Sequence, residues 1–579
     1  MRRRPNPNID AAIRVLLATA SVIAQILFFL WLTDTMVSAG SYLYTAIQAF
    51  SFFTIVKLVN RHDSPSYKIA WILIVFLMPV FGLILYFLWG RANHRRFRKL
   101  HSHNPSRALW DPDGTADARL SAFSAEAPAR SRIPRILQHQ GFPGYHEDTS
   151  VFFPLGEDCF EALCSDLEDA TSYIFLEFFI VGEGFLWDKV SCILRRKARE
   201  GVEVRFMMDD FGGLKLTRFE RNRLTVAGVR VKSFNPILRH LSNLYLNYRN
   251  HQKIVSIDGR IAYTGGVNLA DEYANLNRKH GHWKDTAVRI TGDGVWSLTL
   301  SFLQMWNLDM KTAPSGDELR WRCPAGDACP TGAGRHNAEG GEGAVAGGAA
   351  ASAGGWILPF TDGPSNNPVN PAKAVCPQMI ESSKQNVWIT TPYLILEEDM
   401  IDSLCRTAES GVDVRIITPS IPDKWYVHLV TRSHYGRLIE AGVRIFEYTP
   451  GFMHAKMIVS DDDHALVGTI NFDFRSFYLQ YENAVWFHGS PIVAAVRDDY
   501  LLTLEICKEI PFSEWQKRPW HVKVLAAGFR MFSTLMRRTD RRAGRSRRWS
   551  PDMSASKSAS CPTWTPPPSR PVSPCPPPR

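Results

Sequence analysis

Two copies of one short motif hold the residues of this sequence that are best suited to chemistry. Both copies have the form His-x-Lys-x4-Asp, and their residues are His251, Lys253 and Asp258 in the first copy and His454, Lys456 and Asp461 in the second. Every residue of the second copy lies 203 positions after its counterpart, and the same offset relates Asn268 to Asn471. The chain therefore contains an internal duplication.

On a β-strand, residues i and i+2 point to the same side, so each copy would present one imidazole and one ammonium group together. Two copies that face each other could surround one phosphoryl group with two imidazoles, two lysines and the carboxamides of Asn268 and Asn471. The lysines already neutralise anionic oxygens, so neither a metal ion nor another cofactor is expected. An imidazole has a pKa of about 6.5, so one histidine can attack phosphorus while the other protonates the leaving alkoxide.

Other residues of the motif have a structural interpretation. Asp258 and Gly259 follow a predicted strand and have the composition of a turn, so Asp258 and Asp461 would either hold a strand end or take part in the reaction. Gly265-Gly266 and Gly468-Thr469 are expected to let the backbone approach a phosphate closely.

Composition favours an anionic partner. The 579 residues are enough for two or more domains with a large core, and the formal net charge is +10. A positive balance of this kind suits nucleic acid or a membrane surface. The ten cysteines lack the spacing of zinc ligands, which gives no reason to expect a metal centre.

Three apolar runs predict a membrane anchor: Val15 to Thr33, Tyr42 to Val56 and Ile69 to Gly90. A spanning helix needs about 20 apolar residues, which the third run supplies clearly, the first nearly and the second only marginally. Basic clusters at Arg2 to Arg4 and Arg91 to Lys99 both favour the cytoplasmic side. Both can hold only if an even number of runs cross, so we expect two spans, a re-entrant or surface second run, and catalytic lobes in the cytoplasm.

Strands alternate with helices in both halves of the chain, which predicts an α/β fold. The first half has a strand from Tyr173, a helix and a strand from Gly201, and the second half repeats this order from Val387 and Gly411. We therefore predict two similar lobes, related by a pseudo-twofold axis, that meet at the duplicated motif. The predicted parts are a membrane anchor at 1–100, a linker at 101–145, lobes at 146–310 and 356–515, a Gly/Ala-rich linker at 311–355, and a basic amphipathic segment with a disordered tail at 516–579.

The duplicated motif resembles the signature of the phospholipase D superfamily. In this sequence it is His-x-Lys-x4-Asp-x6-Gly-Gly-x-Asn, followed by the same pattern with Gly-Thr in place of Gly-Gly. One copy fixes few positions and could arise by accident, whereas two copies in register within longer matching segments are very specific. The alternative, that these are ordinary solvated strand residues, is therefore the weaker one.

Within that superfamily, residues 67 to 515 are similar to bacterial cardiolipin synthases. The supporting phrases are Ala70-Trp71, Pro79-Val-Phe-Gly-Leu83, Arg249-Asn-His-Gln-Lys253, Thr264-Gly-Gly-Val-Asn268, Asp271-Glu-Tyr273, Phe302-Leu-Gln-Met-Trp306, Asp362-Gly-Pro364, Thr390-Thr-Pro-Tyr393 and Arg475-Ser-Phe477. The Gly/Ala-rich linker and the tail after about Thr534 depart from the family pattern, and Gln480 stands where the family usually carries Asn. None of these departures touches the motif.

The resemblance implies an activity and further site residues. It implies a phosphatidyltransferase of the bacterial cell membrane that converts two phosphatidylglycerol molecules into cardiolipin and glycerol through a phosphatidyl-histidine, with His251 as the nucleophile and His454 as the acid. It also implies that Asp285 and Glu482, which lie in the matching phrases Asp-Thr-Ala-Val and Glu-Asn-Ala-Val, orient the catalytic imidazoles. Phosphatidylglycerol, other anionic phospholipids and the membrane are the expected partners.

Other functions would use the same motif. A phospholipase D-type hydrolase or a membrane-tethered nuclease needs the same site, and a non-catalytic lipid-binding protein would not need both intact copies. The sequence lacks the aromatic and basic pattern of single-stranded nucleic-acid binding, so no nucleic-acid partner is expected. The second substrate could also be phosphatidylethanolamine or another alcohol.

Overall fold

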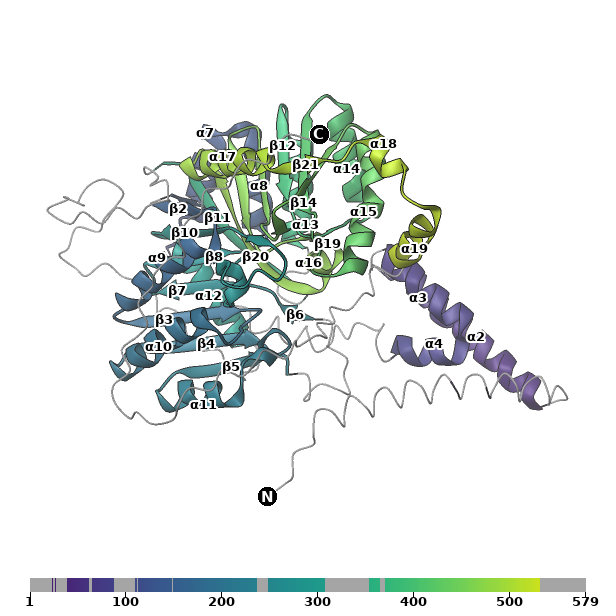
Figure 1. Cartoon of the computed structure of the whole chain (residues 1–579), viewed down its shortest axis with the longest axis horizontal. Helices are drawn as coiled ribbons and strands as arrows, with labels where there is room; N and C mark the ends of the chain where they lie inside the picture. Colours follow the sequence, from purple (N-terminus) through teal and green to yellow (C-terminus); the bar gives the residue numbers. More distant parts are fainter. Residues whose placement is uncertain are drawn as a thin grey trace, which may run out of the picture.

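The computed structural model describes residues 39–61, 65–87, 110–236, 248–307, 354–364 and 370–531, except Pro112 and Asp148, together with Ile23 and Leu27. Two α/β lobes lie against each other, and three helices project from their side (Figure 1). These helices are α2 (Ala39–Val59), α3 (Pro65–Leu77) and α4 (Pro79–Leu85).

The first lobe is built on a seven-stranded sheet with the order β2-β10-β8-β7-β3-β4-β5. The neighbours β3, β4 and β5 are parallel, and the other neighbours are antiparallel. The strands are β2 (Ser150–Phe153), β3 (Tyr173–Phe178), β4 (Glu203–Asp209), β5 (Arg230–Phe234), β7 (Ile254–Ile257), β8 (Ile261–Gly265) and β10 (Ala287–Thr291). The helices of this lobe are α9 (Gly156–Glu168), α10 (Phe185–Arg199), α11 (Arg218–Val226) and α12 (Gly294–Trp306).

The second lobe repeats this order as β11-β20-β18-β17-β12-β14-β15 within a ten-stranded sheet. Its strands are β11 (Trp356–Asp362), β12 (Asn386–Thr390), β14 (Asp413–Pro419), β15 (Arg444–Tyr448), β17 (Met457–Ser460), β18 (His464–Gly468) and β20 (Gln480–His488), joined at the margins by β1 (Tyr145–His146), β6 (Arg249–Asn250) and β21 (Cys507–Glu509). Its helices are α13 (Pro371–Glu381), α14 (Glu398–Glu409), α15 (Trp425–Glu440), α16 (Phe474–Tyr478) and α17 (Pro491–Glu505). The structure thus contains the two similar α/β lobes that the duplication predicts.

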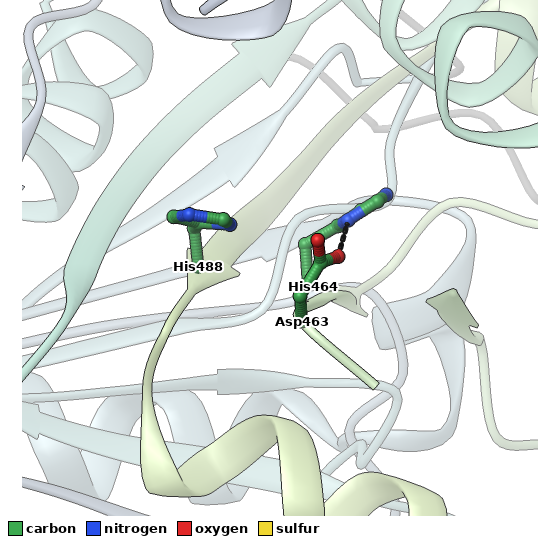
Figure 2. Close-up of side chains that lie close together, drawn as sticks. All are labelled: Asp463, His464 and His488. Carbon is green, nitrogen blue, oxygen red and sulfur yellow. Dashed lines mark hydrogen bonds and ion pairs between the residues drawn. The ribbon is translucent and has the colours of Figure 1, made fainter. Parts of the chain in front are cut away.

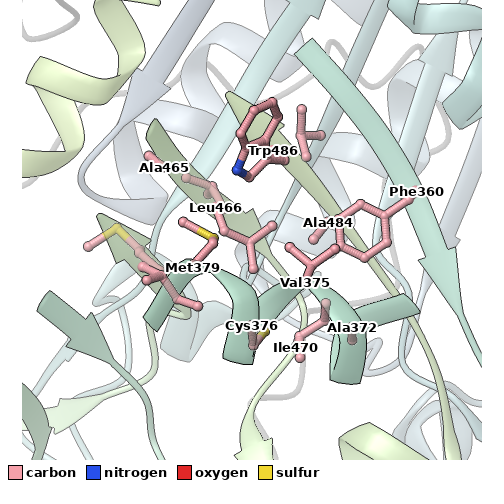
Figure 3. Packing of buried hydrophobic residues seen from close by; sticks show 14 of the residues in the cluster. Phe360, Ala372, Val375, Cys376, Met379, Ala465, Leu466, Ile470, Ala484 and Trp486 are labelled. Atoms are coloured by element: carbon pink, nitrogen blue, oxygen red, sulfur yellow. The ribbon is translucent and has the colours of Figure 1, made fainter. Parts of the chain in front are cut away.

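Apolar strand and helix faces build the cores of the lobes. In the second lobe, α13 contacts β11, and its small and sulfur-containing side chains pack against larger ones from the strands. The residues labelled in this cluster are Phe360, Ala372, Val375, Cys376, Met379, Ala465, Leu466, Ile470, Ala484 and Trp486 (Figure 3). Burial of each large apolar side chain stabilises the fold by about 1.5–3 kcal/mol.

Helix α12 joins the two cores. All of its residues from Gly294 to Trp306 are buried, because it contacts β3, β7, β8 and β10 of the first sheet and also β11 of the second. A helix that is apolar on every side belongs in such a position. The cores of the two lobes are therefore joined by a continuous apolar contact.

The segment at 101–145, expected to be a linker, is folded in its described part. It contains α7 (Ala116–Glu126) and α8 (Arg132–His139), and the β1 strand that follows them pairs with β11. Ile133 and Leu137 lie one turn apart on α8 and are buried, where α8 contacts α13 and β11. The linker expectation was wrong here because a few apolar positions per turn are enough to bury one helix face, even in a Ser-, Pro- and Ala-rich segment.

The apolar N-terminal segments also differ from the expectation. Among the described residues, only α2 holds a stretch long and apolar enough to cross a membrane, Tyr42–Val59. The third run, expected to be the clearest span, divides at Met78 into α3 and α4, because Pro79 has no backbone N–H and its ring opposes the preceding helical turn. The first run lies outside the described residues except for Ile23 and Leu27. The second run, not the third, therefore supplies the described helix of membrane-spanning length and composition.

Candidate active site

Both motif histidines lie where the two lobes exchange short strands. The β6 strand, which immediately precedes His251, pairs in parallel with the start of β20. In the same way β16 (Gly451–Met453), which precedes His454, pairs with β9 (His282–Lys284). The backbone N–H of His251 donates to the Tyr481 carbonyl at 2.8 Å, and that of His454 donates to the Lys284 carbonyl at 2.7 Å. The backbone of the opposite lobe therefore holds each histidine in place.

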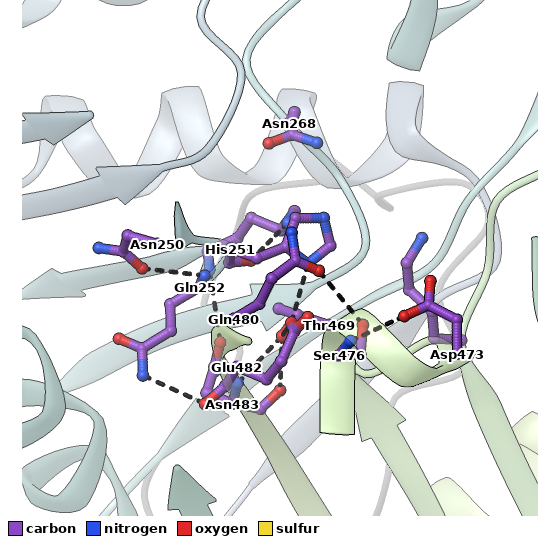
Figure 4. A network of polar contacts seen from close by, with 12 residues as sticks. Asn250, His251, Gln252, Asn268, Thr469, Asp473, Ser476, Gln480, Glu482 and Asn483 are labelled. Atoms are coloured by element: carbon purple, nitrogen blue, oxygen red, sulfur yellow. Dashed lines mark hydrogen bonds and ion pairs between the residues drawn. The ribbon is translucent and has the colours of Figure 1, made fainter. Parts of the chain in front are cut away.

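The predicted orienting carboxylates are also exchanged between the lobes. Nδ1 of His251 lies 2.8 Å from Oε2 of Glu482, and Nδ1 of His454 lies 2.5 Å from Oδ2 of Asp285. Both histidines are only 1% exposed, and both carboxylates are fully buried. Since the carboxylates occupy the Nδ1 side, Nε2 of each ring is the nitrogen left for chemistry. Figure 4 shows the half of this arrangement around His251 and Glu482.

Burial and nearby charges set the protonation of the two pairs. Burial raises the pKa of Glu482 to about 8, although the Lys253 ammonium and the hydroxyls of Thr469 and Ser476 oppose this. Burial also lowers the pKa of His454 to about 3; Lys456 lowers it further, and Asp285 opposes both. His454 is therefore neutral in the free site at neutral pH.

The two motif lysines lie beside the backbone of their own histidines. Nζ of Lys253 donates to the His251 carbonyl at 2.6 Å, and Nζ of Lys456 donates to the His454 carbonyl. Both lysines are buried. Two ammonium groups in such a site attract an anion strongly, because little water is present to screen them.

The motif aspartates hold strand ends in this structure. Each accepts three consecutive backbone N–H groups at the start of a neighbouring strand: Asp258 from Thr171, Ser172 and Tyr173, and Asp461 from Lys384, Gln385 and Asn386. Both aspartates have positive φ, 54° and 52°, as the turn after β7 and β17 requires. These contacts favour the structural interpretation of Asp258 and Asp461 over a direct chemical one.

Arg130, in the segment between the anchor and the first lobe, binds the second of these turns. Its Nη2 lies 2.5 Å from Oδ2 of Asp461, its Nε lies 2.9 Å from Oδ2 of Asp463, and its Nη1 donates to the Ser382 carbonyl at 3.0 Å. Burial would raise the pKa of Asp461, but the backbone N–H groups and Arg130 together hold it below its usual value. In the first lobe, the hydroxyl of Thr171 contacts Asp258 at 3.0 Å.

We expect Arg130→Ala to lower the free energy of unfolding by about 3 to 5 kcal/mol, because it removes the charged partner of a buried carboxylate. The side chains of Arg130 and Asp461 are only 8% and 6% exposed. Because the folded pKa of Asp461 is lowered, its contribution is present above the usual carboxyl pKa and lost as the pH falls through the folded value. Thermal unfolding in detergent should therefore show a difference at neutral pH that narrows in acid. Arg130→Lys is the control that keeps the charge, and an unchanged melting temperature for Arg130→Ala would contradict the expectation.

A group of possible metal ligands lies at the same turn and at the adjacent end of β20. The ligand atoms of Asp463, His464 and His488 lie within 4.8 Å of one another (Figure 2). Asp463 already accepts hydrogen bonds from Nδ1 of His464 and from Arg130, so the guanidinium balances its charge. The group lies at the other end of β17 from His454, and its contacts suit a structural network.

The predicted phosphate-binding asparagines have different surroundings. Oδ1 of Asn268 accepts from the Ile180 N–H at 2.9 Å, and its Nδ2 donates to the Tyr273 hydroxyl at 2.8 Å. Oδ1 of Asn471 is buried without a hydrogen-bond partner in the described part of the chain. An amide nitrogen has two N–H groups, so Asn268 keeps a second donor beyond the one that Tyr273 receives. Phosphate binding by these two residues stays a prediction.

The motif glycines make room for protein atoms. A Cβ on Gly266 would lie 1.9 Å from Oδ1 of Asp285, and a Cβ on Gly468 would lie 2.5 Å from the Asn483 carbonyl oxygen. Thr469 occupies the position equivalent to Gly266 in the second lobe, and its hydroxyl donates to Glu482 at 2.5 Å. Gly266 therefore makes room for the orienting carboxylate Asp285, and Gly468 makes room for the backbone of β20. A close approach of these glycines to a phosphate stays a prediction.

Aromatic rings that the motif does not include surround the histidines. The His454 ring has its centroid 5.4 Å from that of Tyr273, 5.3 Å from Trp283 and 5.8 Å from Phe452, and the His251 ring lies 5.1 Å from Phe179. Tyr273 belongs to a phrase that the sequence singles out. The other three carry no signal of their own, because buried aromatic residues are common in any core.

The chain is similar to known proteins over most of its length. A family model described as "cardiolipin synthase, PLD-like domain" matches residues 163–287 and 377–501, and a phospholipase D-nuclease N-terminal model matches residues 49–91. The cardiolipin synthase of Geobacillus kaustophilus is 33% identical over 488 residues, covering 83% of this chain and 91% of that protein. Cardiolipin synthase 2 of Bacillus cereus is 32% identical over 503 residues, with 85% and 90% covered.

A solved structure shares the fold. The crystal structure of phosphatidylserine synthase from Haemophilus influenzae has a TM-score of 0.50 at 16% identity, and the match covers 69% of this chain and 98% of that one. The duplicated lobes and the paired motifs define an enzyme of the phospholipase D superfamily. Within that superfamily, the chain belongs to the cardiolipin synthase family.

Proposed function

We propose that this enzyme is a membrane phosphatidyltransferase that makes cardiolipin and glycerol from two phosphatidylglycerol molecules. The observation that carries the proposal is the pair of buried histidine–carboxylate units, each completed across the lobe interface and accompanied by a lysine. Membership of the cardiolipin synthase family supports a phospholipid substrate, and the apolar helix α2 supports a membrane location.

In the first step, Nε2 of His251 attacks the phosphorus of one phosphatidylglycerol, and the bond from phosphorus to the glycerol oxygen breaks. Glu482 accepts the Nδ1–H of His251 and stabilises the positive charge that develops on the ring. His454 protonates the departing alkoxide. Its pKa is low in the free site, but an anionic phosphodiester beside the ring raises it. Free glycerol leaves, and a phosphatidyl-histidine remains.

In the second step, a hydroxyl of another phosphatidylglycerol loses its proton to His454, and its oxygen attacks the same phosphorus. The bond from phosphorus to Nε2 of His251 breaks, which releases cardiolipin and restores the imidazole. Lys253 and Lys456 bind the non-bridging oxygens in both steps, assisted by Asn268 and Asn471. Asp285 holds His454 in the orientation that each proton transfer needs.

The burial of the site favours transfer over hydrolysis. Transfer and hydrolysis share the same intermediate and differ in whether an alcohol or water resolves it, so exclusion of water decides between them. Both histidines are 1% exposed. A hydrolase that uses the same residues is the second candidate, and its product would be phosphatidic acid.

The experiment is lipid turnover by the reconstituted full-length enzyme with labelled phosphatidylglycerol as the sole substrate. Cardiolipin and free glycerol in equal amounts are the expected products. Phosphatidic acid in place of cardiolipin would make the enzyme a hydrolase. If phosphatidylglycerol is not consumed, adding phosphatidylethanolamine tests another acceptor or donor, and DNA hydrolysis measured on the same preparation tests the nuclease.

The attack by His251 should become faster as the pH rises through about 8 if Glu482 governs it. Below its raised pKa of about 8, Glu482 is protonated and donates to Nδ1, so Nε2 carries the ring proton and cannot attack. Above it, the carboxylate accepts Nδ1–H and leaves the Nε2 lone pair free. On phosphatidyl-p-nitrophenol, whose leaving group needs no general acid from His454, the kcat/KM of the wild type should therefore increase between pH 7 and 9, whereas Glu482→Gln should be slow and flat over that range. A variant that keeps the rising limb would show that another group is responsible.

We also propose that the catalytic lobes face the cytoplasm of a bacterial cell. The basic cluster from Arg91 to Lys99, between the apolar segments and the lobes, supports this side. Protease added to sealed right-side-out vesicles should leave the lobes intact, and protease added to inside-out vesicles should digest them. The opposite pattern would place the lobes outside.

A further inference from the structure

Exposed apolar side chains occupy corresponding loops of the two lobes. In the first lobe, the chain leaves β4, passes through η3 (Gly212–Lys215) and enters α11, and on the way Leu214 and Phe219 are 65% and 69% exposed. In the second lobe, the chain leaves the equivalent strand β14 and enters α15, where Ile421 and Trp425 are 40% and 63% exposed. Scattered exposed apolar residues need no explanation, but their recurrence at equivalent loops does.

Both loops lie beside the catalytic motif. Asp209, the last residue of β4, accepts the backbone N–H of Asn250 at 3.0 Å, and Asn250 immediately precedes His251. In the second lobe, Asp423 accepts from the Tyr393 hydroxyl at 2.6 Å. The Tyr393 ring contacts Phe452, which in turn contacts His454. The loops that carry the exposed side chains therefore begin beside the motif in the first lobe and contact the aromatic surroundings of His454 in the second.

The apolar surface continues onto a C-terminal helix, α19 (Trp520–Met531). This helix packs on α15, where the rings of Phe529 and Trp425 have centroids 5.6 Å apart. The sequence predicts a basic amphipathic segment here, and the structure shows it packed on α15 with an exposed outer face. On that face Trp520 is 75% exposed and Val524, one turn later, is 63% exposed.

The membrane anchor joins the molecule on the same side. The Tyr67 ring, at the start of α3, stacks on Phe474 of α16 with the centroids 6.4 Å apart. The α16 helix follows β19 (Phe472–Asp473), which pairs with β13 (Leu394–Ile395), directly after Tyr393. Figure 1 shows α2 to α4 projecting from the side of the molecule that carries α15 and α19.

We propose that these side chains form a membrane-docking rim through which phospholipids enter the site directly from the bilayer. The rim consists of Leu214, Phe219, Ile421, Trp425, Trp520 and Val524. Its occupant is the lipid surface, because Trp425 and α19 lie on the side from which the apolar helices project, and tryptophan favours the membrane interface. Exposed Lys215 and Arg218, between Leu214 and Phe219, suit anionic headgroups. The lipid substrate itself rests on the function proposed above.

The first test compares Trp425→Ser with Leu502→Ser in the reconstituted full chain. Leu502 is 66% exposed but lies on α17, which Figure 1 places across the second lobe from α19. Each enzyme is given long-chain phosphatidylglycerol within phosphatidylcholine vesicles, or water-soluble dihexanoylphosphatidylglycerol added to vesicles of phosphatidylcholine alone. We expect Trp425→Ser to lose its rate on the vesicle lipid by roughly tenfold or more and to keep its rate on the soluble lipid. Leu502→Ser should keep its rate on both lipids. If Trp425→Ser loses rate equally on both lipids, or loses no rate on the vesicle lipid, the proposed membrane-docking rim is wrong.

The second test needs no turnover. Benzoylphenylalanine is introduced in place of Trp425 or Leu502, and the protein is irradiated in phosphatidylcholine vesicles. Adducts with lipid acyl chains are expected at position 425 and not at position 502. No adduct at 425 would overturn the rim even if the wild type makes cardiolipin, and an adduct at 425 would support it even if phosphatidylglycerol is not the substrate.

Discussion

Replacement of either motif histidine with alanine should reduce lipid turnover by roughly 10⁴-fold or more. Proton transfer by a positioned group contributes roughly 10²- to 10⁴-fold, and removal of the nucleophile also removes the covalent route. The double variant His251→Ala/His454→Ala should be no worse than the more damaged single variant, because residues that act as one unit do not add. The measurement is initial turnover of labelled phosphatidylglycerol, with Leu502→Ser as a matched surface control.

Trapping the covalent intermediate of the wild type can separate the roles of the two histidines. Rapid denaturation during wild-type turnover, followed by peptide mapping, should find the phosphatidyl group on the peptide that contains His251. A label on the peptide that contains His454 would reverse the proposed roles. Near-wild-type turnover by either alanine variant would rule out a mechanism that needs both histidines.

Asp285→Asn should impair His454, although Asp285 lies in the lobe that contains His251. An asparagine keeps the size of the side chain but cannot hold the imidazolium that forms during proton transfer, so we expect a loss of roughly 10²- to 10⁴-fold. Glu482→Gln should impair His251 in the same way. The 2.8 Å and 2.5 Å contacts across the lobe interface are the reason for both expectations.

A substrate with a good leaving group can test whether each histidine is oriented by the carboxylate of the opposite lobe. Release of nitrophenol from phosphatidyl-p-nitrophenol needs no general acid, so the first turnover should be largely restored in His454→Ala and Asp285→Asn. The same burst should stay absent in His251→Ala and slow in Glu482→Gln. If Asp285→Asn instead behaves like His251→Ala, each carboxylate serves the histidine of its own lobe, and the crossed assignment fails.

The duplication made much of the fold predictable. It also concealed that each histidine pairs with the carboxylate of the opposite lobe. A fixed offset of 203 residues relates β7 to β17 and β8 to β18 residue for residue, so one half of the chain serves as a template for the other. Spacing along the chain pairs each histidine with the carboxylate that follows it. The exchange depends on β6 and β9, short strands that pair with the opposite lobe, and no local pattern encodes their partners.

Two other differences have local causes. In the third apolar run, composition alone indicated a span, but Pro79 interrupts the helix that would have to form it. In the segment from 110 to 146, the polar composition indicated a linker, but Ile133, Leu137 and Arg130 each find a buried partner surface on the second lobe. Contacts far apart in sequence decided this case, and composition does not report such contacts.

The exchanged strands also decide when the enzyme can first work during its own synthesis. His251 leaves the ribosome 231 residues before Glu482 does, and β6 has no strand to pair with until β20 has been made. Domains generally fold as units in the order of their synthesis, so the first lobe can fold early but carries only an unoriented histidine. A chain truncated before β20 should therefore be inert toward lipid. Each new molecule becomes reactive only after nearly the whole chain has emerged.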